Sequence, residues 1–176
     1  MGEIKSTLDI VMEKTKDLVL SKEEKTEYNI NEAKKSLKGL LQKFEDKVLD
    51  REQLEQELNI LQESYGLKEK NILIGEILGR LNLVKDNRPI LVLLHESFGI
   101  DVSSFESLLN NFQDTIYKET QKRMNVIKDN LAEKCFISGS AVFPNIEADD
   151  EWKAKIRGIK NKFADKLGQE KAVLTN

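Results

Sequence analysis

Apolar residues recur at steps of three and four along almost the whole chain, and alternation with a period of two is hard to find. This spacing places apolar side chains in one stripe along a helix, whereas strands of a half-buried sheet need the period of two. The sequence therefore predicts an all-α protein, an irregular helical bundle of about five to seven helices with two or more long amphipathic ones.

Length and charge limit the classes of protein to consider. A chain of 176 residues can bury a core without metal or disulfides, and we expect a single helical domain over residues 1–176. The net charge of -3 provides no general attraction for a polyanion. Cys135 is the only cysteine, and the longest apolar run, residues 89–94, is far too short to span a membrane. We expect a cytoplasmic protein.

The first half of the chain carries two signals for helix starts. Residues 21–24, Ser-Lys-Glu-Glu, form a capping box, and residues 50–53, Asp-Arg-Glu-Gln, form a second one with Leu49 placed to pack against Leu54. These signals favour a helix that ends near Leu49 and a new one after it. The alternative is one unbroken helix over residues 22–65, because Leu54 and the apolar residues that follow keep the earlier register.

The middle of the chain predicts two buried helices. Residues 72–84 are apolar around most of a helix, and Pro89 begins a second apolar run for which a short buried strand is the alternative. Gly66 and Gly99 each follow an aromatic residue, which is typical of a left-handed residue at a helix C-terminus. We further expect a long helix from about 105 to 135 and a last one from Asp149 or Asp150 that ends before Gly168.

Few residues offer chemistry. One histidine, His95, and one cysteine cannot build a zinc cluster, and Ser138-Gly139-Ser140 lacks the frame of a nucleophile turn. Cys135 falls on an apolar stripe and is predicted to be core, while His95 is expected to bond a backbone carbonyl near a helix end. We expect no catalytic, cofactor or metal residues and no enzyme. Residues 137–145 are interpreted as a connector, with phosphate binding as the alternative.

The last helix, residues 149–168, is basic and amphipathic. Its apolar residues lie on one side, and its cations outnumber a single acid, Asp165, between residues 152 and 167. Such helices are used at anionic membranes and in grooves, while a simple surface helix of the bundle is the alternative. The candidate contacts to an anionic surface are Lys153, Lys155, Arg157, Lys160, Lys162 and Lys166.

Two segments carry a resemblance. The opening, residues 1–8 (Met-Gly-Glu-Ile-Lys-Ser-Thr-Leu), and residues 137–145 (Ile-Ser-Gly-Ser-Ala-Val-Phe-Pro-Asn) resemble an uncharacterised family of small bacterial helical proteins. The resemblance implies a bacterial cytoplasmic setting, and it brings no known activity or site.

These observations favour a non-catalytic helical scaffold or adaptor that acts through protein–protein contacts. We expect it to form a homo-oligomer, namely a dimer. A heptad seam of about two repeats supplies the candidate interaction surface. Residues 1–20 carry a second narrow apolar stripe and are an alternative oligomerisation arm. The second hypothesis is peripheral attachment to an anionic membrane or nucleic acid through the basic helix. The candidate interaction surface is Ile30, Leu37, Leu40 and Phe44.

Overall fold

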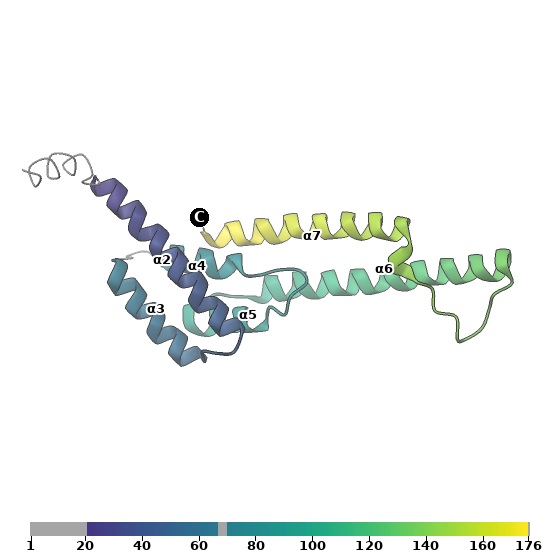
Figure 1. Ribbon diagram of the computed structural model, residues 1–176, viewed down its shortest axis with the longest axis horizontal. Helices are drawn as coiled ribbons and strands as arrows, with labels where there is room; N and C mark the ends of the chain where they lie inside the picture. The colour runs from purple at the N-terminus through teal and green to yellow at the C-terminus, as the bar shows by residue number, and fades with distance from the viewer. Residues whose placement is uncertain (1–20, 67–69, 176) are drawn as a thin grey trace, which may run out of the picture. The chain divides into compact units, whose positions relative to one another are not determined.

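The computed structural model describes residues 21–66 and 70–175, and in that part of the chain it contains six α-helices, one short 3-10 turn and no strand. The all-α prediction is therefore confirmed. The helices are α2 (Lys22–Glu45), α3 (Arg51–Tyr65), α4 (Lys70–Gly79), α5 (Arg88–Phe98), α6 (Ser103–Cys135) and α7 (Asp150–Thr175), with the turn η1 (Ile146–Ala148) before α7 (Figure 1).

The chain divides into two compact units, Met1–Glu76 and Ile77–Asn176. The division follows backbone packing alone, so the single domain expected over residues 1–176 stays a prediction. The proposed oligomerisation arm, residues 1–20, lies outside the described residues.

Both predicted capping boxes form, and they separate α2 from α3. The Ser21 hydroxyl accepts the N–H of Glu24 at 3.1 Å, and the Glu24 carboxylate accepts the N–H of Ser21 at 2.6 Å. Asp50 and Gln53 repeat this exchange at 2.8 and 3.0 Å. Each box satisfies two backbone donors that a helix start leaves free. The predicted break near Leu49 is therefore confirmed, and the single helix over residues 22–65 is wrong.

Helices α2 and α3 pack against each other in the first unit. Each contributes one row of buried side chains at steps of three or four, as an amphipathic helix requires. Lys34 and Lys38 on α2 also approach Glu76 of α4, each at 3.9 Å. The buried residues of the two helices are Ala33, Leu37, Leu41, Leu54, Leu58 and Leu61.

Helix α4 ends at Gly79, earlier than the apolar pattern to residue 84 predicts. The loop after it is organised by the buried amide of Asn87, which accepts the N–H of Asn82 at 2.8 Å and donates to the carbonyl of Asn82 at 2.6 Å. These bonds replace helical ones and turn the chain. Val84, expected to be buried, is therefore 73% exposed.

The apolar run that begins at Pro89 forms α5, so the helical interpretation of this run is confirmed. Pro89 itself lies in the first turn of α5. The strand alternative is wrong. Gly99 ends α5 with φ 67°, and Gly66 ends α3 with φ 62°, both in the left-handed region that favours glycine.

Helices α6 and α7 lie side by side as a long hairpin in the second unit (Figure 1). Phe112 of α6 meets Phe163 of α7 edge to face, with ring centroids 5.4 Å apart. The predicted end of the last helix before Gly168 is wrong, because α7 continues to Thr175 and Lys171 of this extension donates to the carbonyl of Leu81 at 2.8 Å.

Candidate interaction surface

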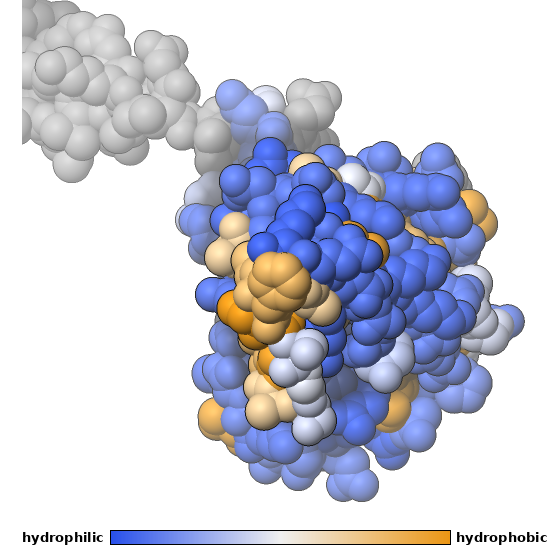
Figure 2. All heavy atoms as spheres, turned by 90° about the vertical axis from the view of Figure 1, so that its right-hand side faces the viewer, coloured by the Kyte–Doolittle hydropathy of each residue, from blue (hydrophilic) through white to orange (hydrophobic). Residues whose placement is uncertain are grey.

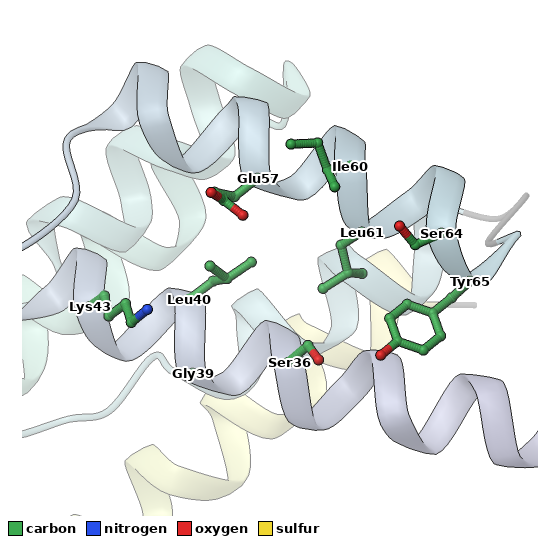
Figure 3. Close-up of a pocket in the computed structure, with 9 residues that line it drawn as sticks. All are labelled: Ser36, Gly39, Leu40, Lys43, Glu57, Ile60, Leu61, Ser64 and Tyr65. Atoms are coloured by element: carbon green, nitrogen blue, oxygen red, sulfur yellow. The ribbon is translucent and has the colours of Figure 1, made fainter.

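A shallow groove of about 280 Å³ runs along one flank of the α2–α3 pair (Figure 3). The two helices run in opposite directions along it, so that each forms one wall. We call it the α2–α3 groove. Its lining residues are Ser36, Gly39, Leu40, Lys43, Glu57, Ile60, Leu61, Ser64 and Tyr65.

The middle of the α2–α3 groove is apolar. Leu61 is buried and Leu40 is half-buried, but Ile60 is 57% exposed. Ile60 lies off the stripe that α3 buries, so its side chain faces the groove instead of the core. Full burial of such a side chain stabilises by about 1.5–3 kcal/mol, and Ile60 obtains only part of this gain from the described residues.

Gly39 leaves an open notch in the α2 wall of this groove. A Cβ atom added at Gly39 would meet nothing within 4 Å. Glycine costs a helix interior about 0.5–1 kcal/mol relative to alanine, and the described part of the chain leaves the space around Gly39 empty. The notch is therefore free for a side chain that comes from outside.

Charged and polar residues mark the two ends of the groove. Lys43 on α2 and Glu57 on α3 stand on opposite walls at one end, and Ser36, Ser64 and Tyr65 stand at the other (Figure 3). Lys43 and Glu57 are both exposed, and neither forms an ion pair with any residue in the described part of the chain. The groove therefore carries one charge of each sign, one on each wall.

The structure separates the four residues of the predicted interaction surface. Leu37 is buried, whereas Ile30, Leu40 and Phe44 are half-buried, and of the four only Leu40 lines the α2–α3 groove. Whether these residues contact another molecule stays a prediction. The sequence analysis did not predict Ile60 and Gly39 as members of this surface. The sequence did contain one signal for Ile60, because this isoleucine lies outside the row of apolar residues at steps of three and four that α3 buries.

A second groove, of about 570 Å³, lies in the second unit along α6 and α7. It is largely apolar, and its most exposed apolar members are Val84 and Tyr117, at 73% and 66%. Among the described residues that line it, Lys160 is the only cation and none is an acid. The lining residues are Leu83, Val84, Phe112, Gln113, Ile116, Tyr117, Thr120, Trp152, Ile156 and Lys160.

All six predicted cations of the basic helix are exposed on α7, which packs through the buried side chains of Trp152 and Leu167. The six cations form two rows along α7, because residues separated by three, four or seven positions lie on the same side of a helix. One row is Lys153, Arg157 and Lys160, and the other is Lys155, Lys162 and Lys166.

Several of these cations already have partners inside the second unit. Lys155 forms an ion pair with Glu119 of α6, and Lys153 pairs with Asp150 at 3.2 Å. Lys122 and Lys155 donate hydrogen bonds to the Glu119 carboxylate and lower its pKa from 4.5 to about 2. Lys166 lies over the ring of Phe163, 5.4 Å from its centroid. The predicted contacts are thus exposed but partly neutralised.

The connection from α6 to η1 exposes apolar side chains at the end of the α6–α7 hairpin. Phe136 is 90% exposed and Phe143 is 78% exposed, with Lys128 5.8 Å from the ring centroid of Phe143. Figure 2 views this end and shows an apolar patch surrounded by hydrophilic side chains. Cys135 beside it is exposed, so the prediction that Cys135 is core is wrong.

His95 makes the contact that the sequence predicts, since its Nδ1 lies 3.3 Å from the carbonyl oxygen of Ile100 just past the end of α5. The side chain is exposed, and the expectation that His95 has no catalytic or ligand role stays a prediction. In the part of the chain that the structure describes, no group of three or more His, Cys, Asp or Glu side chains could hold a metal ion, and no helix is long and apolar enough to cross a membrane.

No family model, no curated protein and no solved structure gives a significant match to this chain. This outcome is consistent with the resemblance to an uncharacterised family that residues 1–8 and 137–145 carry.

Proposed function

We propose that this protein is a non-catalytic helical scaffold or adaptor that self-associates, as a dimer, through the α2–α3 pair. The observation that carries the proposal is the exposed Ile60 beside Leu40 in an open groove between two helices. An apolar side chain of this size that faces a groove gains stability when another surface covers it.

The size and lining of the α2–α3 groove favour a protein partner over a small molecule. Pockets for small ligands measure about 300–1,000 Å³ and enclose most of the ligand, and this groove is both smaller and open along its length. Its walls present residues at steps of three and four over two turns of each helix. Such ridges and gaps accept the side chains of another helix.

The mass of the full chain in solution tests this proposal. Light scattering over a range of concentrations is expected to give twice the chain mass of 20.2 kDa. Ile60→Asp is expected to shift the protein toward monomer, because it buries a charge in the contact. Val84→Asp is the matched control, since Val84 is also highly exposed but lies in the second groove. A wild-type chain that is monomeric at every concentration would overturn the proposal.

A second candidate function is attachment to an anionic surface through α7. The observation that favours it is that all six cations are exposed while the apolar side of α7 is packed inside the second unit. Each cation near an anionic membrane would contribute about 1 kcal/mol, and binding to a membrane or to nucleic acid would weaken with salt.

Co-sedimentation with anionic vesicles and with nucleic acid at low and physiological salt tests this second candidate. Arg157→Glu combined with Lys162→Glu should abolish binding, because it reverses two of the six positive charges. The double variant should still fold, since neither residue has an ion pair in the described part of the chain. A chain that binds neither vesicles nor nucleic acid at low salt does not have this function.

We place the scaffold in the bacterial cytoplasm. Two observations support this proposal: residues 1–8 and 137–145 resemble a family of small bacterial proteins, and Cys135 is the only cysteine of the sequence, so the chain forms no internal disulfide.

A further inference from the structure

We infer that the α2–α3 groove is closed by the same groove of a second copy of the chain, with a twofold axis that runs along the groove. This inference rests on the proposed self-association through α2 and α3 and adds the symmetry and the contacts. Dimers with twofold symmetry use the same surface on both copies, so the surface must be complementary to itself. The charges and the shape of this groove both meet that condition.

The symmetry follows from the two walls. A twofold axis along the groove places α2 of one copy over α3 of the other. Because α2 and α3 run in opposite directions within one copy (Figure 3), every facing pair in the dimer is antiparallel as well. The result is a four-helix arrangement in which each helix has antiparallel neighbours, the common arrangement of such bundles.

The charges pair under this axis. Lys43 and Glu57 lie at the same end of the groove on opposite walls. When the walls are exchanged, Lys43 of each copy faces Glu57 of the other, and two ion pairs form at once. An axis across the groove would instead bring this charged end over the end with Ser36 and Ser64, which leaves both charges unpaired.

The shape of the walls is also self-complementary. Four groove residues of α2, at positions i, i+3, i+4 and i+7, are Ser36, Gly39, Leu40 and Lys43, and those of α3 are Glu57, Ile60, Leu61 and Ser64. Four residues with this spacing form the hole that receives one side chain of a facing helix. Ile60 of the second copy would enter the α2 hole, where Gly39 leaves the necessary space. Leu40 would enter the α3 hole.

The second groove does not share these properties. Lys160 is the only charged residue among the described ones that line it, so two copies of that groove would bring like charges together and offer no acid to pair them. This difference directs the inference to α2 and α3.

Charge exchange at Lys43 and Glu57 in the full-length chain tests the arrangement. Lys43→Glu places four carboxylates in the contact, and Glu57→Lys places four ammonium groups there. Each single variant is expected to raise the dimer dissociation constant about tenfold or more, measured by sedimentation. The double variant restores both pairs and should return to the wild-type constant. An equimolar mixture of the two single variants should form a heterodimer, since each charge then meets its opposite.

Gly39→Leu tests the shape independently of charge. Leucine fills the notch and is expected to weaken dimerisation at least tenfold, while the urea midpoint of the folded chain does not fall, because leucine favours an exposed helix over glycine. Gly158→Leu is the matched control, an exposed helical glycine of α7 with equally open space, and it should leave dimerisation unchanged. A wild-type chain that stays monomeric overturns the proposed function itself. A wild-type dimer that Lys43→Glu and Gly39→Leu leave intact overturns this symmetry and these contacts, but not the self-association.

Discussion

Arg123 of α6 and Asp149, just before α7, are joined by two parallel hydrogen bonds, of 3.0 Å from Nε to Oδ1 and 2.7 Å from Nη2 to Oδ2. The same Oδ1 accepts the N–H of Trp152 at 2.7 Å, so Asp149 also caps the start of α7. Arg123 further pairs with Glu151 at 2.5 Å. One carboxylate thus fixes both where α7 begins and where that end lies against α6.

Asp149→Asn is expected to lower the stability of the chain at neutral pH. Asparagine can still cap a helix, but it cannot form the charged pair with Arg123. The hydrogen bonds from Arg123 and from the backbone of Trp152 lower the pKa of Asp149 below its ordinary 3.8. Its contribution is therefore complete above pH 3.8 and is lost as the pH falls through the lower folded value.

Urea midpoints at neutral pH and well below pH 3.8 check this prediction, since the wild type should exceed Asp149→Asn at neutral pH and the gap should narrow in acid. Asp165→Asn, an exposed carboxylate on the outer side of α7, is the control and should change little. Equal midpoints of wild type and Asp149→Asn at neutral pH would contradict it.

Glu119 predicts a second acid-sensitive contribution. Hydrogen bonds from Lys122 and Lys155 lower its pKa from 4.5 to about 2, so the stabilisation is complete above pH 4.5 and is lost as the pH falls through about 2. Glu119→Gln should make the fall in unfolding free energy between pH 4.5 and 2 less steep than in the wild type. Chemical denaturation at several pH values measures this slope. Glu133→Gln, which changes an exposed carboxylate on the same helix, is the control and should keep the wild-type slope. An identical slope in the wild type and in Glu119→Gln would contradict the prediction.

Helix boundaries were predictable where neighbouring residues determine them. The boxes at Ser21 and Asp50, and the left-handed glycines at 66 and 99, depend on atoms within a few positions, and the structure forms all four. By contrast, the early end of α4 depends on Asn87, whose bonds to Asn82 cross five residues. A periodic apolar pattern contains no information about such a loop.

The candidate site was harder to predict than the fold. Its α2 wall was partly expected, because Leu40 belongs to the heptad seam. Its α3 wall depends on how far each helix is rotated about its own axis in the pair, and that rotation exposes Ile60 and opens the space at Gly39. Single-sequence spacing indicates which face of a helix is apolar, but it does not show which edge of that face stays uncovered.

Leu37→Ala is expected to lower the free energy of unfolding by about 2–5 kcal/mol, because Leu37 is only 1% exposed and its loss leaves a cavity. Urea denaturation of the full chain measures the change. Tyr28→Ala on the same helix removes a larger side chain that is 58% exposed, and it should cost less than about 0.5 kcal/mol. Similar losses for the two variants would show that α2 does not bury the face described here.

Lys47→Gly is expected to stabilise the chain by about 0.5–1 kcal/mol. Lys47 follows the end of α2 and has a φ of 59°. The N–H of Val48 donates to the carbonyl of Lys43 at 2.8 Å, and this hydrogen bond caps the C-terminus of α2. Glycine adopts this left-handed conformation without the clash that a Cβ atom causes, and the exposed Lys47 side chain gives up no burial. Urea midpoints decide the matter, with Lys47→Ala as the control. Alanine keeps the Cβ atom and should bring no gain, so equal stabilisation by both substitutions would mean that the lysine side chain, and not its backbone conformation, is unfavourable.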